Sequence, residues 1–437
     1  MKTGQRCSTG PARGGQPDQR TNVNQPTGIL NQRVVPALTV LSENTYLSAI
    51  RAGMVSVVPL TIIGGLFMIV AYFPLPGWDR VVAPYLQLLQ VPITATFGLL
   101  AVFACFAIGY DLGKRLKQEP IVSATMATLI FLMLQIQLKD LTFSMNGLGS
   151  KGLFTAILIA LVVVRVQKFF TDKNIVVKLP DNVPPIVYES FLSLSPLFFL
   201  VLVFWLIRFV LGVDINHLVE ITFKPLVFAL NTLPGILVYA FLVTLLWSVG
   251  INGDNAMDAI VAPIFLQYLA ANVVATTQGQ PLPYVTANGF FSTFVNVGGT
   301  GATIALALVM WNSKEPGFRK VSRLSLPTQI FQINEPIFFG FPIVLNPILM
   351  IPYILNALLL TAGTYLLMHW NVIHKPFVNV PWTTPPILGH YLVSGGDWKA
   401  ALWGAISIVI AMLVYFPFAK AAERQRLQAE AAGKARE

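Results

Sequence analysis

Long apolar runs, separated by short charged or irregular segments, make up most of this chain of 437 residues. A membrane-spanning helix needs about 20 predominantly apolar residues. Ten runs come near to that length or exceed it, at residues 54–73, 95–110, 121–138, 152–166, 191–212, 234–251, 259–276, 296–312, 341–368 and 400–418. The pattern predicts an all-α, polytopic membrane protein with about ten transmembrane helices.

The charged residues are too few to cover a soluble protein. They make up 11% of the chain, against about 25% in soluble proteins, so most of the surface must face a lipid bilayer. The formal charge is +10, and basic segments follow the second, fourth, eighth and tenth runs, at 111–117, 168–178, 314–323 and from Lys420 onward. Because Lys and Arg are enriched in cytoplasmic loops, this rhythm predicts that both termini are cytoplasmic. Nucleic-acid binding is not expected, since no basic helix with interleaved aromatic residues is present.

The two ends and the cysteines narrow the possibilities further. Residues 1–33 are rich in Gly, Pro, Gln, Asn and Arg, which predicts a disordered cytoplasmic head, and residues 420–437 are expected to form a cytoplasmic tail. The two cysteines, Cys7 and Cys105, exclude a disulfide framework. With no P-loop motif and no histidine at a metal-ligand spacing, neither a cofactor nor a metal is expected.

Polar breaks rich in proline and glycine interrupt the apolar runs of the second half. They lie at residues 250–255 (GINGDN), 298–301 (GGTG), 325–341 and 381–386 (PWTTPP). Irregular backbone at membrane depth is tolerated only where it is buried in protein or lines a cavity. The second half is therefore expected to carry the binding site.

Glu335 is the most informative ionisable residue, because apolar side chains flank it in residues 331–340 (FQINEPIFFG). An ionisable group inside a membrane costs at least about 2.5 kcal/mol and by default marks a substrate or ion pathway. The alternative is a glutamate at the membrane surface, paired with Arg323. Asn334 and Pro336 on either side favour the pathway, because they indicate a held, polar turn.

A second polar cluster follows Trp247 and consists of Asn252, Asp254, Asn255 and Asp258. Helix capping would place Asn252 or Asp254 at the N-cap and Asp258 in the first turn. Capping alone does not explain two amides and an aromatic side chain at one break. Trp247, Asn252 and Asp254 are therefore candidate substrate-binding residues, with capping left open as the alternative.

Trp382 and Thr383 form a third candidate group, in the proline-rich break. An indole offers an apolar face and one hydrogen-bond donor, which suits stacking on a sugar ring. A tryptophan in the aromatic belt at the membrane interface is the alternative.

Short motifs in a fixed order also point to a family. They are residues 52–65 (AGMVSVVPLTIIGG), 148–154 (LGSKGLF), 179–185 (LPDNVPP), 334–336 (NEP) with 346–347 (NP), and 381–386 (PWTTPP) with 395–397 (GGD). From about Val35 to about Lys420, the chain resembles the membrane-embedded IIC component (the permease) of a bacterial sugar phosphotransferase system, in the lactose, cellobiose and diacetylchitobiose branch.

The resemblance implies a homodimer in the bacterial plasma membrane, with re-entrant hairpins and amphipathic helices beside the spans. Residues 34–230 would form the dimer interface, and residues 231–419 would bind the sugar. The substrate would be a disaccharide whose 6-hydroxyl receives phosphate from a separate IIB protein, which a IIA protein supplies. Neither Cys7, in the head, nor Cys105, inside a span, is expected to carry that phosphate.

Motif positions also imply roles for single residues. Glu335 would hold the sugar hydroxyl and take its proton, Asn334 would supply an amide, and Trp247 and Trp382 would supply stacking faces.

One position departs from the family pattern. Where the family has Gly-Ile-His-Gly, this chain has residues 250–253 (GING). Asn252 keeps a hydrogen-bonding side chain but cannot carry positive charge, and Asp254 would repel a nearby phosphate.

Two other functions remain open. An ion-coupled sugar or small-solute transporter would use Glu335 or Asp254 as its coupling carboxylate, and a membrane sugar sensor would have little transport.

Overall fold

The structure is a computed structural model that describes residues 44–73, 77–175, 192–341, 343–344 and 346–434. The predicted head at residues 1–33, with Cys7, and the motif at residues 179–185 lie outside the described residues.

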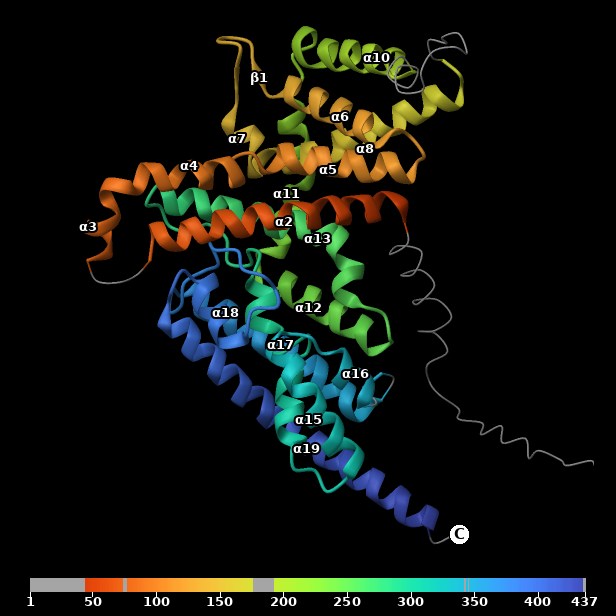
Figure 1. Cartoon of the computed structure of the whole chain (residues 1–437), viewed down its shortest axis with the longest axis vertical. Coiled ribbons are helices and arrows are strands. Elements are labelled where there is room, and N and C mark those ends of the chain that lie inside the picture. The colour runs from red at the N-terminus through yellow and green to blue at the C-terminus, as the bar shows by residue number, and fades with distance from the viewer. Residues whose placement is uncertain (1–43, 74–76, 176–191, 342, 345, 435–437) are drawn as a thin grey trace, which may run out of the picture. The chain divides into compact units, whose positions relative to one another are not determined.

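Helices dominate the first half of the chain (Figure 1). They are α2 (Thr45–Ala71), α3 (Trp78–Val82), η2 (Ala83–Tyr85), α4 (Leu86–Phe97), α5 (Leu100–Arg115), α6 (Pro120–Leu134), α7 (Met145–Leu148), η3 (Ser150–Gly152), α8 (Leu153–Asp172), α10 (Leu194–Trp205), η4 (Leu206–Val210) and α11 (Ile215–Leu230). A small exception to the predicted all-α fold is an antiparallel hairpin of β1 (Ile136–Gln137) and β2 (Thr142–Phe143).

The second half consists of helices that are separated by irregular loops. They are α12 (Leu233–Ser248), α13 (Gly253–Thr277), η5 (Phe290–Val295), α14 (Thr303–Met310), α15 (Pro316–Ile330), α16 (Glu335–Gly340), α17 (Pro347–His369), α18 (Pro386–Val393) and α19 (Trp398–Lys434). Each of the four predicted breaks contains a loop that precedes a helix: 250–252 precedes α13, 298–302 precedes α14, 331–334 precedes α16 and 381–385 precedes α18. Two of the predicted breaks are too wide, since residues 253–255 begin α13, and within 325–341 residues 325–330 end α15 and residues 335–340 form α16.

Six helices of the described residues are long and apolar enough to cross a membrane, judged by length and composition. They are Thr45–Ala71, Trp78–Arg115, Ser150–Asp172, Gly253–Thr277, Pro347–His369 and Trp398–Ala432. Leu194–Val210 and Ile215–Leu230 would add a seventh as one bent span, with an angle of 86° between its parts. The apolar helices Pro120–Leu134 and Leu233–Ser248 are shorter, so the count of about ten spans stays a prediction.

Capping side chains explain where several helices begin. Asn44 accepts hydrogen bonds from the backbone N–H groups of the first turn of α2. Glu119 and Glu315 do the same for α6 and α15, and each precedes a proline at the first helical position. A proline fits there because its missing N–H would have no partner inside the helix.

Small residues bring the helices of the first half close together, and Figure 1 shows α4 and α5 following one another along α2. A Cβ on Gly53 of α2 would lie 2.3 Å from Cγ1 of Ile108 in α5. A Cβ on Gly109 of α5 would lie 3.1 Å from Cα of Ala124 in α6. Such close approach gives the van der Waals contact that holds helices together in lipid.

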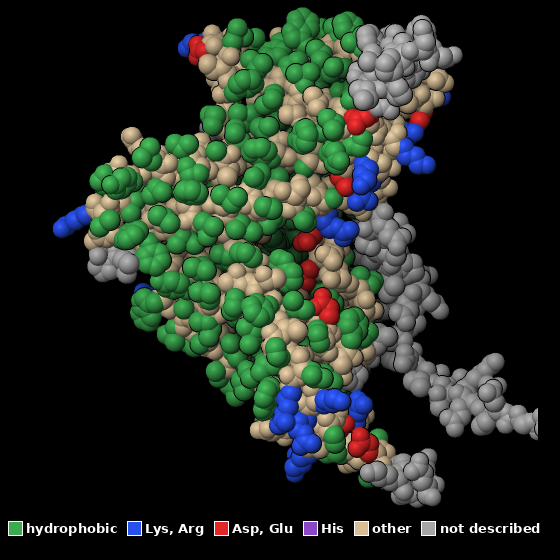
Figure 2. Space-filling model, in the orientation of Figure 1, with side chains coloured by type: hydrophobic (Ala, Val, Ile, Leu, Met, Phe, Trp, Pro, Cys, Tyr) green, Lys and Arg blue, Asp and Glu red, His purple; other side chains and the backbone are tan. Residues whose placement is uncertain are grey.

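The surface of the described residues suits a bilayer. Figure 2 shows hydrophobic side chains over most of one face, with Lys and Arg gathered at its lower end, over α15 and the last turns of α19. Phe198 is 68% exposed and Leu413 is 70% exposed, which lipid tolerates far better than water does. On α15, Arg319, Lys320 and Arg323 are exposed, in keeping with an amphipathic helix at a membrane surface.

Candidate functional site

Asp254 lies where three interrupted segments of the second half meet. It stands in the first turn of α13, half-buried, and its carboxylate accepts three side-chain hydrogen bonds. Oδ2 accepts from Trp247 Nε1 at 2.8 Å and from Thr300 Oγ1 at 2.7 Å. Oδ1 accepts from Asn296 Nδ2 at 3.4 Å. These three hydrogen bonds tie α12, α13 and the loop before α14 together.

Asn334 extends this network to the loop before α16. Its side chain is 4% exposed, and Nδ2 donates to the backbone oxygen of Thr300 at 3.1 Å. A Cβ on Gly299 would lie 2.4 Å from Cβ of Asn334, so only glycine permits this approach of the two loops. Trp247 packs edge-on against Phe338 of α16, with ring centroids 5.1 Å apart. The structure therefore brings Trp247, Asp254 and Asn334 together.

Asn252 is the N-cap of α13. Its Oδ1 accepts from the backbone N–H of Asn255 at 2.9 Å, so of the two predicted capping candidates the structure selects Asn252 rather than Asp254. The side-chain amide keeps two N–H donors beyond this cap. Arg51 of α2 donates to the backbone oxygen of Asn255 at 3.0 Å, which joins the first half of the chain to this turn.

Glu335 follows Asn334 directly and begins α16, with its side chain exposed. The alternative pairing with Arg323 is not formed, because Arg323 donates to the backbone oxygen of Trp311 and to Oδ1 of Asn312, both at 3.4 Å. Within the described residues, the ion pairs do not include Glu335. Its carboxylate is thus open to an incoming group.

Trp382 and Thr383 lie in the loop before α18, where Trp382 is 59% exposed and Thr383 is partly buried. The loop folds on itself through a bond from Thr384 Oγ1 to the backbone oxygen of Pro381 at 2.7 Å. Gln332 Nε2 donates to the backbone oxygen of Thr384 at 3.4 Å. This loop therefore connects to the loop before α16, although its two candidate residues make no bond to Asp254 that the described residues show.

Comparison with known families decides the classification. The family described as "Phosphotransferase system, EIIC" matches residues 51–357. The chain belongs to the phosphotransferase system EIIC family.

Known EIIC proteins resemble this chain over nearly its whole length. The lichenan permease IIC component of Bacillus subtilis (strain 168) is 32% identical over 435 residues, covering 93% of this chain and 96% of that protein. The cellobiose-specific EIIC component of Geobacillus stearothermophilus is 34% identical over 431 residues, covering 92% and 96%.

A solved structure extends the likeness to the fold. The transporter ChbC, the IIC component from the N,N'-diacetylchitobiose-specific phosphotransferase system, superposes with a TM-score of 0.86. It is 32% identical in sequence, and the match covers 92% of this EIIC chain and 99% of that chain. This confirms the predicted family and a membrane-embedded, mostly helical fold. EIIC components are the transport components of a system that also has IIA and IIB components.

Three residues of this EIIC network were not among the predicted site residues. They are Asn296, Thr300 and Gln332, which join segments between 33 and 52 positions apart in the sequence. Each is a polar residue among apolar neighbours in the sequence, a pattern that can indicate a buried hydrogen bond but does not predict which residue is its partner. Among the described residues, no group of three or more His, Cys, Asp or Glu side chains could hold a metal ion.

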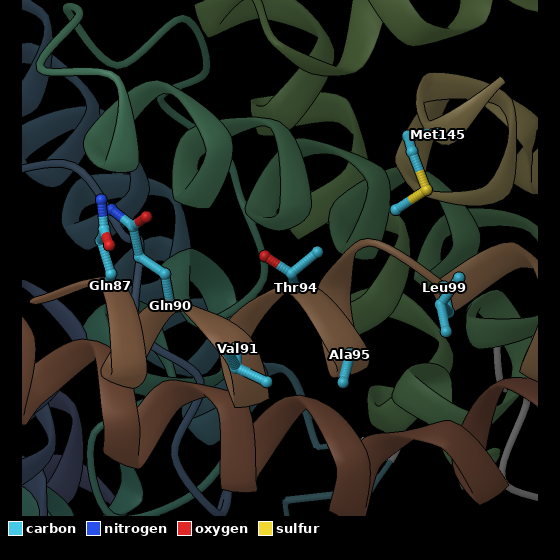
Figure 3. Close-up of a pocket in the computed structure, with 7 residues that line it drawn as sticks. All are labelled: Gln87, Gln90, Val91, Thr94, Ala95, Leu99 and Met145. Carbon is cyan, nitrogen blue, oxygen red and sulfur yellow. The ribbon is translucent and has the colours of Figure 1, made fainter.

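A pocket of about 380 Å³ lies away from these residues, on α4 and α7 (Figure 3). It is lined by Gln87, Gln90, Val91, Thr94, Ala95, Leu99 and Met145. Figure 3 shows Gln87, Gln90 and Thr94 along one helix, with Met145 coming from a separate segment. Its place in the first half sets it apart from the candidate sugar site.

Proposed function

We propose that this EIIC chain is a permease for a β-linked disaccharide of the cellobiose or diacetylchitobiose kind. The observation that carries the proposal is the polar network around Asp254 and Asn334, held between interrupted helices of an otherwise apolar protein. Transporters bind their substrates at such interrupted helices. The names of the similar proteins, which refer to lichenan, cellobiose and diacetylchitobiose, supply the sugar class.

The sugar contacts follow from exposure and bonding. Trp382 presents an exposed indole for stacking on a sugar ring, with Thr383 beside it. Trp247 is 5% exposed, already donates to Asp254 and packs against Phe338, which supports a role in shaping the site rather than in stacking on the sugar. Asn252 has amide donors left for a sugar hydroxyl, and its lack of charge makes it a partner for a neutral sugar rather than for a phosphate.

Glu335 would perform the chemical step that falls to this chain. It would accept a hydrogen bond from the 6-hydroxyl and take its proton as that oxygen attacks the phosphorus of a phosphocysteine on IIB. The new O–P bond forms as the S–P bond breaks, and the thiolate leaves with IIB. Phosphoryl transfer depends mainly on positioning and charge stabilisation, so an oriented hydroxyl is the contribution of the permease.

The phosphocysteine belongs to a separate protein in this proposal. Cys105 is fully buried in α5 and cannot receive phosphate from a soluble donor. Alone, the chain would therefore transport the sugar without catalysing its phosphorylation.

The membrane arrangement and the homodimer are further parts of the proposal. The cluster of basic residues on α15 and α19 supports a cytoplasmic C-terminus, and the positive-inside bias supports a cytoplasmic N-terminus in the bacterial plasma membrane. The pocket of Figure 3 supports a dimer interface in the first half, because the exposed side chains of Gln87 and Thr94 would otherwise face lipid.

Uptake into proteoliposomes tests the function. With phosphorylated IIA and IIB supplied inside, labelled cellobiose should accumulate as its phosphate, and omission of IIB should abolish that accumulation. Uptake that proceeds without IIB and stops when the proton gradient is collapsed would instead establish an ion-coupled transporter. Sugar binding with no flux under either condition would establish a sensor.

A further inference from the structure

Gln332 connects three loops of the second half through one side chain. Its Oε1 accepts from the backbone N–H of Gly298 at 2.6 Å and from that of Gly299 at 3.0 Å. Its Nε2 donates to the backbone oxygen of Thr384 at 3.4 Å. Gln332 itself belongs to the loop before α16, so the side chain joins the loops before α14, α16 and α18.

Each of these loops carries proposed sugar-site residues. The loop before α14 contains Thr300, which donates to Asp254. The loop before α16 contains Asn334 and leads into Glu335. The loop before α18 contains Trp382. The way in which the loop before α18 is placed against the loop before α16 therefore sets the position of the Trp382 indole relative to the Glu335 carboxylate.

Backbone geometry shows that Gln332 is held firmly. Its φ is +67°, in the left-handed region that non-glycine residues seldom adopt, and its side chain is 6% exposed. Such a conformation is unfavourable for a residue with a Cβ and persists where surrounding contacts determine it. Glutamine suits the place because its amide accepts two bonds at the oxygen and still donates at the nitrogen.

We propose that Gln332 is a positioning residue of the sugar site, which sets the Trp382 loop against the loops that carry Thr300 and Glu335. The proposal rests on the proposed function, since it assigns the three loops to one sugar. Gln332 acts through these loops and does not itself need to touch the sugar.

Two substitutions distinguish the bonds that Gln332 accepts at Oε1 from the bond that it donates at Nε2. Gln332→Glu keeps an oxygen for the N–H groups of Gly298 and Gly299 but has no N–H for the backbone oxygen of Thr384, so it should release only the Trp382 loop. Gln332→Met removes both connections. Gln329→Met is the matched control, because Gln329 is a buried glutamine of α15 whose side-chain atoms have no hydrogen-bond partner among the described residues.

Hydrogen exchange without sugar gives the first readout. In Gln332→Glu, amides in residues 381–386 should exchange faster while those in 298–301 stay protected, and in Gln332→Met both segments should exchange faster. Unchanged exchange at 381–386 in Gln332→Glu would overturn the proposal. This readout does not need a sugar, so it remains decisive even if the wild type binds no disaccharide and the proposed function fails.

Sugar affinity gives the second readout. Cellobiose should bind about 5- to 10-fold more weakly to Gln332→Glu and about 50-fold more weakly to Gln332→Met, with Gln329→Met within about twofold of the wild type. In a Trp382→Ala background, Gln332→Glu should add less than about twofold, because the loop it positions has lost its stacking face. Full additivity of the two changes, or an equal loss in Gln329→Met, would overturn the proposal. If Gln332→Glu does not fold, Gln332→Asn takes its place, since its side chain is too short to reach both loops.

Discussion

The two halves of this chain hold their helices together in different ways. In the first half, helix contacts helix directly, as at Gly53 against Ile108 and Gly109 against Ala124. In the second half, helices also contact one another directly, as α14, α17 and α18 do on α19. In addition, single side chains there, such as Asp254 and Gln332, bond to several loops at once. Direct packing makes a stiff scaffold, whereas hydrogen bonds between loops leave polar groups that a sugar can use.

Polar pairs exist in the first half too, but they serve another purpose. Ser123 donates to Gln167 at 2.6 Å between α6 and α8, and both side chains are buried. Gln135 and Asn216 exchange two bonds, at 3.1 and 3.2 Å. Each of these pairs joins two elements and includes no ionisable group, so it contributes to helix association rather than to a substrate site.

Helix α2 is where the two halves meet. Its Thr61 accepts from Asn379 Nδ2 at 2.7 Å, and a Cβ on its Gly65 would lie 2.7 Å from the backbone oxygen of Asn379. Its Arg51 donates to the turn that begins α13. Helix α13, which carries Asp254, also packs directly against α2. The scaffold thus holds α13 by helix packing as well as by these hydrogen bonds.

Removal of the Asp254 carboxylate, in the second half, should have the largest effect on sugar affinity. Asp254→Ala leaves the donors of Trp247, Thr300 and Asn296 without their acceptor, and a buried donor left without a partner costs about 1–3 kcal/mol. We expect cellobiose affinity to fall by about 100-fold or more in an isothermal titration. Asp254→Asn keeps one acceptor oxygen and should fall less. Wild-type affinity in Asp254→Ala would show that the network does not shape the sugar site.

A pair of glycine substitutions gives the next largest contrast. Gly301→Ala would place a Cβ 2.3 Å from the ring of Tyr353 at a φ of +75°, so the loop before α14 must shift. Sugar affinity should fall by about 10-fold or more, since the loop carries Thr300. Gly53→Ala makes an equally close contact in the first half and should lower thermal stability while cellobiose affinity stays within about twofold. An equal loss of cellobiose affinity in both variants would show that the two halves do not differ in their effect on the sugar site.

Substitution of Gln167 tests the first half with a polar side chain. Gln167→Leu removes the acceptor for Ser123 in the buried contact between α6 and α8. The melting temperature in detergent should fall by a few degrees, consistent with a loss of about 1 kcal/mol, and sugar affinity should not change. A large loss of affinity would mean that the first half shapes the site directly.

The smallest effect is expected at the departure from the family motif. Asn252→His restores an ionisable ring where the chain has Gly250-Ile-Asn-Gly253. Phosphorylation-coupled uptake should rise by about threefold as a positively charged ring offsets the repulsion between Asp254 and phosphate. No change in uptake would indicate that the site has accommodated Asn252 in its capping role.

Local patterns in the sequence predicted the breaks but not the connections between them. Gly250-Ile-Asn-Gly253 and Pro381-Trp-Thr-Thr-Pro-Pro386 cannot continue a helix, so their place in the chain was enough to predict loops. The bond between Thr300 and Asp254 spans 46 positions, and the bonds of Gln332 span 33, 34 and 52. No periodicity reports pairings of that separation, which depend on how whole helices pack.

The division of the chain into helices after residue 191 was also not predictable from the local sequence pattern. The apolar run at 191–212 matches α10 and η4, which end before Gly212, whose φ is +68°. No predicted run covers α11, which Asp214 caps and which lies at 86° to the preceding helix. The capping role of Asn252 could be anticipated only as one of two choices, because Asn and Asp are nearly equal at an N-cap.

Binding of cellobiose to purified wild-type protein and to Glu335→Gln tests the central claim most directly. The substitution keeps the size of an exposed side chain at the start of α16 and removes only its charge, so the fold should persist with an unchanged melting temperature. If Glu335 holds a sugar hydroxyl, affinity should fall by about 10-fold or more, since a bond to a carboxylate is stronger than one to an amide. Equal affinity in the two proteins would place the sugar elsewhere and contradict the account.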